Sequence, residues 1–162
     1  MTSGSVMETL PNGIMVWRNA EKLIHRLDGP AIIKPGCYEE WRINGQRHRE
    51  DGPAVERVNG SKKWYIRGNL HRLDGPAVIE DSSEEHWAYG RMLNWFLLKR
   101  FHTMIPQKHL AYFLLAFPSI ELDTTKAEVY SLTGWNPDTT PTEHQTSTWH
   151  MMVALQPPPF LL

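Results

Sequence analysis

A seven-residue motif occurs three times in the first half of the chain, and its spacing constrains the fold more than any other feature. The motif reads His-Arg-x-Asp-Gly-Pro-Ala and begins at His25, His48 and His71, so that both intervals are 23 residues. A period of about 20 to 50 residues is typical of chains in which each unit stacks on its neighbours. The N-terminal half is therefore expected to be a repeat protein.

A tryptophan recurs with the same period. Trp41, Trp64 and Trp87 each follow the histidine of their motif by 16 residues. A weaker unit precedes them, because an Asn-Gly pair stands five residues before Trp17, as another does before Trp64. We therefore expect about four units, with the three regular tryptophans stacked on one face.

Each unit is predicted to be a β-hairpin. In the Asp-Gly-Pro turn, Asp caps its own backbone, Gly accepts a positive φ and Pro fixes φ. Around each tryptophan the residues alternate, with Trp41 and Ile43 on one face and Glu40 and Arg42 on the other. This pattern predicts an antiparallel meander of about eight short strands, two in each unit. We expect residues 12–92 to form the meander and residues 1–11 to be an N-terminal lead.

The repeat resembles the MORN (membrane occupation and recognition nexus) repeat, whose hairpins also carry a Trp, a following Gly and then a His. It is more similar to the His-Arg-x-Asp-Gly-Pro-Ala repeat of uncharacterised proteins from tailed phages and giant viruses. Arg26, Arg49 and Arg72 stand where MORN units usually have Gly. The resemblance implies a hairpin architecture. Because of these arginines and the added Asp-Gly-Pro turn, the resemblance gives less reason to expect the lipid binding that is associated with MORN proteins.

The second half has a helical periodicity. Apolar residues at helical spacing run from Trp95 to Ile105 and again from Leu110 to Phe117. A shorter helix is expected over 125–133, since its start has a capping-box spacing and Gly134 is placed as its C-terminal cap. We assign residues 93–134 to a helical segment.

The apolar helices need a surface to cover, and the tryptophan face of the meander is the candidate. The predicted fold class is therefore α+β, a hairpin meander covered on its Trp face by C-terminal helices. Residues 135–162 are rich in Pro and Thr and end in Pro-Pro-Pro-Phe-Leu-Leu. They are expected to be an extended tail, which offers a route to a homo-oligomer.

Composition excludes several classes of protein. Seventeen basic and 18 acidic residues give a formal charge of −1, so no net field attracts nucleic acid or an anionic membrane. The single cysteine, Cys37, excludes an internal disulfide and a zinc site built on cysteines. Neither a signal peptide nor a membrane-spanning stretch is evident. These features favour a cytoplasmic protein.

The repeated histidines do not predict a metal site. Equivalent residues in neighbouring hairpins are about 9–10 Å apart, whereas a zinc ion needs all its ligands within about 2 Å. We expect each His and Asp to fasten its own turn. The residues expected to be structural are His25, Asp28, Gly29, Trp41, His48, Asp51, Gly52, Trp64, His71, Asp74, Gly75 and Trp87.

The sequence predicts no catalytic residue, metal or cofactor, because it has no phosphate loop, metal triad or nucleophile elbow. Two binding functions remain open. One is a protein–protein interaction module, which the viral resemblance would make an inhibitor of a host protein. The alternative is a site for nucleotide, phosphoinositide or nucleic acid on the Arg and Trp surface. Candidate binding residues are Arg42, Lys63, Tyr65, Arg67, Arg49 and Arg72.

Overall fold

The computed structural model describes residues 4–121 and 124–154, apart from the side chains of Trp95, Gln107 and Lys108. The fold is α+β, as the sequence predicts. A large antiparallel sheet comes first in the chain, and four helices follow in its described C-terminal part.

The chain divides into two compact units. Residues 1–72 and 76–90 form the first, which we call the repeat unit, and residues 73–75 and 91–162 form the second, the helical unit. None of the helices in the described residues is long and apolar enough to cross a membrane.

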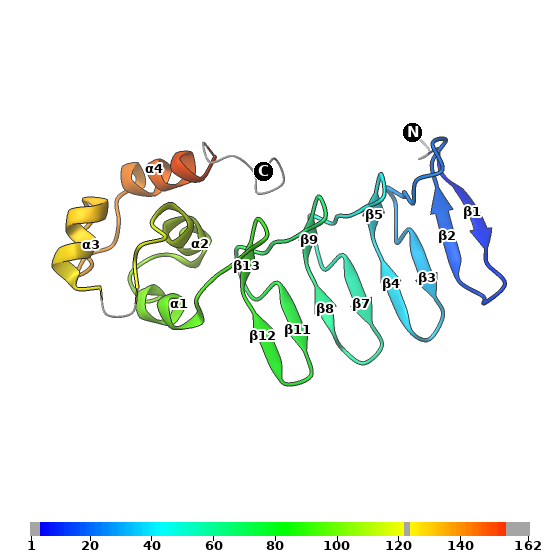
Figure 1. Cartoon of the computed structure of the whole chain (residues 1–162), viewed down its shortest axis with the longest axis horizontal. Helices are drawn as coiled ribbons and strands as arrows, with labels where there is room; N and C mark the ends of the chain where they lie inside the picture. Colours follow the sequence, from blue (N-terminus) through cyan, green and yellow to red (C-terminus); the bar gives the residue numbers. More distant parts are fainter. Residues whose placement is uncertain (1–3, 122–123, 155–162) are drawn as a thin grey trace. The chain divides into compact units, whose positions relative to one another are not determined.

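Four long hairpins make one eight-stranded antiparallel meander (Figure 1). Each hairpin pairs with the next, so the sheet grows by two strands per unit. Its strands, in spatial order, are β1 (Val6–Thr9), β2 (Met15–Arg18), β3 (Ile32–Lys34), β4 (Tyr38–Glu40), β7 (Val55–Arg57), β8 (Lys62–Lys63), β11 (Val78–Glu80) and β12 (Ser83–Glu85).

A short second hairpin follows three of the long ones, in addition to the two strands that the sequence predicts for each unit. Its turn begins with a non-glycine residue at positive φ, Asn44, Arg67 or Tyr89, and each is followed by a glycine at positive φ. This pair of left-handed residues is typical of a type I′ turn. The short strands are β5 (Arg42–Ile43), β6 (Gln46–Arg47), β9 (Tyr65–Ile66), β10 (Asn69–Leu70), β13 (Trp87–Ala88) and β14 (Arg91–Met92).

The repeats begin earlier in the chain than the sequence predicts. Residues 1–11 were expected to be a lead, but β1 lies within them and pairs with β2 along its whole length, from Val6 with Arg18 to Thr9 with Met15. The weak first unit therefore contains a complete long hairpin.

The prediction that Trp87 continues the tryptophan series is wrong. The backbone N–H of Arg49 donates to the carbonyl of Tyr65, and the N–H of Arg72 donates to the carbonyl of Trp87. Trp87 therefore occupies the position of Tyr65 in its repeat, one residue beyond the position of Trp64.

This shift arises in the turn between β11 and β12, which is one residue shorter than the turn between β7 and β8. Val55 pairs with Lys63, eight residues later, whereas Val78 pairs with Glu85, seven residues later. Every residue after the shorter turn is displaced by one position. His86 consequently stands where the earlier units have tryptophan.

The helical unit has an aromatic core of its own. Phe101, Phe113, Trp135 and Trp149 are almost fully buried. The Phe113 ring lies edge-on to both indoles, with centroid distances of 5.4 and 4.9 Å. The helices are α1 (Trp95–Phe101), α2 (Gln107–Ala116), α3 (Lys126–Thr133) and α4 (Glu143–Ala154).

Local signals in the sequence predicted α3 correctly. The Thr125 hydroxyl accepts from the N–H of Glu128, and the Glu128 carboxylate accepts from the N–H of Thr125, which completes a capping box. Gly134 ends the helix in the left-handed conformation, with φ 67°.

The prediction of an extended segment over 135–162 is wrong where it can be compared. Residues 143–154 form α4, and both tryptophans of the segment, Trp135 and Trp149, are in the core of the helical unit. The final Pro-Pro-Pro-Phe-Leu-Leu lies outside the described residues. The packing of helices on the tryptophan face stays a prediction.

Candidate functional site: the arginine–tryptophan stacks

Each arginine of the repeated motif lies on the ring of the tryptophan that precedes it in the chain, an arrangement that we call an arginine–tryptophan stack. An indole face attracts a cation through its quadrupole, most strongly for Trp. The guanidinium carbon lies 4.2, 4.0 and 4.1 Å from the ring centroid in the pairs Arg26–Trp17, Arg49–Trp41 and Arg72–Trp64.

Glycine forms the other side of the stack. A Cβ added at Gly29 would lie 3.0 Å from the guanidinium carbon of Arg26, and one at Gly52 would lie 2.9 Å from that of Arg49. Neither glycine has a positive φ. The expectation that the Asp-Gly-Pro glycine serves a left-handed turn is therefore wrong. These glycines are needed because the arginine lies against their backbone.

The rest of the motif bonds to the edge of the guanidinium. In two stacks Nε donates to an aspartate Oδ1 at 2.9 Å, from Arg26 to Asp28 and from Arg49 to Asp51. These bonds hold the pKa of both carboxyls below the usual aspartate value. One terminal nitrogen donates to the proline carbonyl of the motif at 3.3, 3.2 and 3.2 Å in the three repeats. Arg49 also donates to Glu56 at 3.0 Å.

The alanine that ends the motif is completely buried. Ala31, Ala54 and Ala77 each have 0% of their surface exposed. Their carbonyls accept from the N–H groups of the stacked tryptophans at 2.8 to 2.9 Å. A larger side chain at these positions would separate neighbouring units.

The histidine fastens the next repeat and not its own turn, which corrects the expectation. Nδ1 of His25 accepts from the N–H of Asn44 at 3.1 Å, and Nδ1 of His48 accepts from Arg67 at 3.2 Å. Nδ1 of His71 accepts from Tyr89 at 3.1 Å. Each donor is the left-handed residue of a short hairpin turn. The bond thus holds a strained turn on the preceding unit.

Most of the candidate binding residues already have partners within the chain. Arg49 and Arg72 are held in stacks. Arg67 is exposed at the turn between β9 and β10, and Tyr65 lies under the guanidinium of Arg47, 5.3 Å from its ring centroid.

Two other candidates are paired with carboxylates. Lys63 lies 2.7 Å from Glu80. Arg42 donates to Glu40 at 2.6 Å, and Arg47 donates to the same carboxylate at 2.8 Å. Glu40 is only 5% exposed. The polar face that the alternation around Trp41 predicts is therefore an internal ion-pair cluster at this position.

Asp74 and Gly75 belong to the third and last copy of the motif. Asp74 is exposed and Gly75 is buried, and both belong to the helical unit. Cys37 is exposed at the tip of the β3–β4 hairpin.

A pair of histidines in the helical unit was not singled out from the sequence. His109 on α2 lies with Nδ1 2.9 Å from Nε2 of His150 on α4, and the Tyr112 ring stacks on His150 at 3.7 Å. The two histidines are 41 residues apart, and no spacing rule links them. In the described part of the chain no group of three or more His, Cys, Asp and Glu side chains is arranged to hold a metal ion.

Comparison of the chain with family models, with curated proteins and with solved structures gives no match. The likeness to MORN repeats rests on the motif residues alone.

Proposed function

We propose that this chain is a non-catalytic protein-binding module. The observation that carries the proposal is the number of large apolar side chains that the helical unit leaves in solvent. Aromatic residues and methionine are enriched in protein–protein interfaces. The side chains concerned are Met92, Phe96, Tyr130, Leu132, Met151 and Met152.

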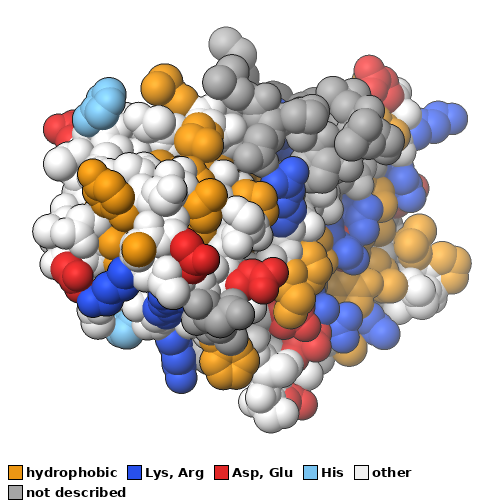
Figure 2. Space-filling view, turned by 60° about the vertical axis from the view of Figure 1, so that its left-hand side comes forward, with side chains coloured by type: hydrophobic (Ala, Val, Ile, Leu, Met, Phe, Trp, Pro, Cys, Tyr) orange, Lys and Arg blue, Asp and Glu red, His pale blue; other side chains and the backbone are white. Residues whose placement is uncertain are grey.

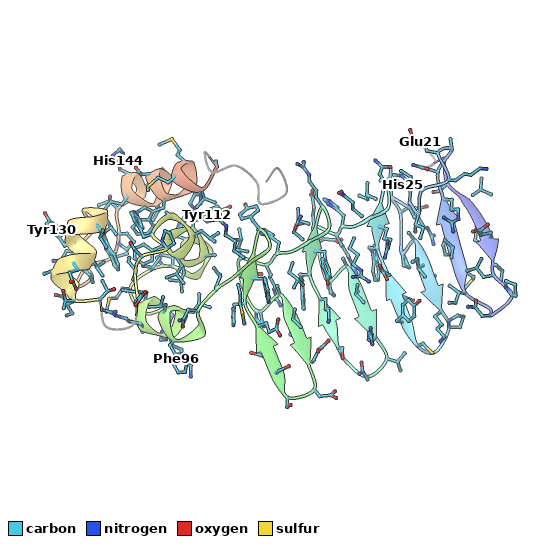
Figure 3. All side chains as sticks on the ribbon, in the orientation of Figure 1. Glu21, His25, Phe96, Tyr112, Tyr130 and His144 are labelled. Carbon is cyan, nitrogen blue, oxygen red and sulfur yellow. The ribbon has the colours of Figure 1, made fainter. Side chains whose placement is uncertain are left out.

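Phe96 is the strongest candidate for a contact residue. It is 64% exposed on α1, whereas Leu97 and Leu98 beside it are buried. Phe96 and Tyr130 both project away from their helices (Figure 3). Hydrophobic side chains reach the surface at several points among polar ones (Figure 2). A ring held in water on a rigid helix loses little conformational entropy when a partner covers it.

The alternative, a site for phosphate-bearing ligands, has less support. A phosphate site needs guanidinium or ammonium groups that are available to the ligand. The arginines of the motif already bind a ring, a proline carbonyl and, in two repeats, an aspartate. Among the candidates, Arg67 has the most accessible side chain.

The partner class follows from the resemblance. A viral or phage origin would make the partner a host protein and the chain a cytoplasmic inhibitor. A homo-oligomer formed through the C-terminal tail is the second form of the same proposal, because the tail ends in an apolar sequence.

The test is capture of a partner by the immobilised full chain from host-cell lysate, followed by size-exclusion chromatography of the complex. We expect one protein in near-equal amount, retained in the presence of a chelator. Phe96→Ser should abolish capture. Val58→Ser is the matched control, because Val58 is also apolar and exposed but lies on the repeat unit.

Two results would contradict the proposal. If wild type and Phe96→Ser captured the partner equally, the surface around Phe96 would not be the binding site. A thermal shift with ATP or phosphoinositide vesicles, lost in Arg67→Ala, together with no captured protein, would favour the phosphate ligand.

A further inference from the structure

The three histidines of the motif share a chemical requirement. Each presents Nδ1 as a hydrogen-bond acceptor to a backbone N–H of the next unit, at 3.1 to 3.2 Å. Nδ1 accepts only when it carries no proton, so the ring must be neutral with its proton on Nε2. A protonated ring would present an N–H to another N–H.

The residue that donates each of these hydrogen bonds lies in a turn and has a positive φ. Asn44, Arg67 and Tyr89 have φ of 48°, 48° and 50°. Asn adopts this conformation readily, but Arg67 and Tyr89 hold it only where surrounding contacts stabilise it. Loss of the acceptor therefore removes a support of the turn as well as a link between units.

We propose that His25, His48 and His71 form a series of proton-sensitive clamps, which release the contacts between neighbouring hairpin repeats when the pH falls below about 6. This inference does not depend on the proposed function. It gives the repeat unit a conformational response to acid.

The charged groups around the three rings differ in one repeat. Glu50 Oε1 lies 3.5 Å from Nε2 of His48, whereas Leu27 and Leu73 occupy the corresponding positions beside the other two histidines. In the described part of the chain, Glu50 is the one carboxylate within 4 Å of these rings. The middle clamp is therefore the one that has an acidic neighbour.

The sign of the effect follows from His71. Burial lowers the pKa of His71 below the usual histidine value, and its ring contacts Tyr89 at a centroid distance of 4.3 Å. The unfolded chain then binds more protons than the folded chain as the pH falls through about 6.5. The stabilisation is complete above that pH and is lost as the pH falls through the lowered pKa.

The test uses amide hydrogen exchange of the full chain, read residue by residue at pH 7.5 and pH 5.5. We expect the protection factors of the Asn44, Arg67 and Tyr89 amides to fall about tenfold, because opening is favoured about tenfold for each pH unit below the unfolded pKa. The triple variant His25→Asn, His48→Asn, His71→Asn should lose this dependence. The Asn oxygen can accept the same bond and does not titrate.

His144→Asn is the control variant, because His144 is exposed on α4. It should leave the three protection factors as they are in wild type. Residue-level measurement is needed because the helical unit also contains histidines, among them the His109–His150 pair.

Unchanged protection in wild type between the two pH values would overturn the proposal. So would an equal loss of protection in wild type and triple variant. If the triple variant does not fold at pH 7.5, the same exchange measurement on the single variant His48→Asn tests the proposal. In that variant the Arg67 amide should become independent of pH while the Asn44 and Tyr89 amides keep their response.

Discussion

The two units of this chain bury their residues in different ways. The helical unit packs large aromatic side chains edge to face, with Trp135 and Trp149 around Phe113. The repeat unit buries alanines and covers its tryptophans with arginines of the same series. A packed core depends on shape and volume, whereas the repeats depend on bonds of defined direction between neighbours.

This difference predicts how each unit responds to a change. A chain of repeats is stabilised by intrinsic and nearest-neighbour terms, so a lesion in one stack weakens two adjoining units. A single apolar core loses its packing as a whole when one large side chain is removed. The predictions below compare the two, beginning with the largest expected effect.

Trp149→Ala should have the largest effect. The side chain is fully buried and contacts the rings of Phe113, Phe117 and Trp135. Removing such a ring destabilises a core by about 3–5 kcal/mol. Chemical denaturation followed by far-ultraviolet circular dichroism should show the helical unit unfolding at lower denaturant. Amides of β2, β3 and β4 should keep their exchange protection.

The control is Met151→Ala on the same helix, because its side chain is exposed. It should change the midpoint little. A Trp149→Ala protein with the stability of wild type would mean that α4 is not part of the core.

Gly52→Val should have the next largest effect, about 1–3 kcal/mol. The new Cβ would lie 2.9 Å from the guanidinium carbon of Arg49 and would push it off the ring of Trp41. Thermal unfolding of the repeat unit measures the loss. In the Arg49→Ala background the same substitution should be much less harmful, because the clashing group is gone. Additive losses in the double variant would show that the glycine is needed for another reason.

The sequence predicts the repeat and its period. It does not predict which residues of the chain the repeated side chains contact. Several partners of each motif lie outside it, such as Trp41 for Arg49 and Asn44 for His25. Sequence spacing gives the period and does not give the pairing. The displaced Trp87 shows the same limit, since one residue lost in a turn changes the register without changing the 16-residue interval.

Of the helices α3 and α4, the sequence predicts only α3, although a capping box precedes both. The capping box of α3 was recognised from Thr125 and Glu128. The same signal is present before α4, where Thr142 and Gln145 bond to each other's backbone N–H. This signal alone does not predict a helix, because the surrounding residues are Thr, Pro and His, which are typical of extended segments. Burial of Trp149 stabilises α4, and that contact is not visible in local sequence.

Arg49→Ala and Arg26→Ala compare two stacks within the repeat unit. Both lose a ring contact, an aspartate and a proline carbonyl, but only Arg49 also binds Glu56. We expect Arg49→Ala to be more destabilising than Arg26→Ala by about 0.5–1 kcal/mol, the net value of one further hydrogen bond. Urea midpoints at one pH measure the difference. Equal midpoints would mean that the bond to Glu56 contributes nothing to stability.

Asp51→Asn should have the smallest effect and one confined to acid. The Arg49 guanidinium lowers the pKa of this exposed carboxyl, so the folded chain binds fewer protons than the unfolded chain around pH 4. The stabilisation is present above the unfolded pKa and is lost as the pH falls through the lowered value. Asp51→Asn removes it at neutral pH and should flatten the stability profile below about pH 4. Salt should reduce the difference, since the pair is exposed. Asp81→Asn, at an exposed turn carboxylate between β11 and β12, is the matched control. If both variants had the same acid profile, the Arg49–Asp51 bond would not be a source of stability, and the stack would depend on the ring and the glycine alone.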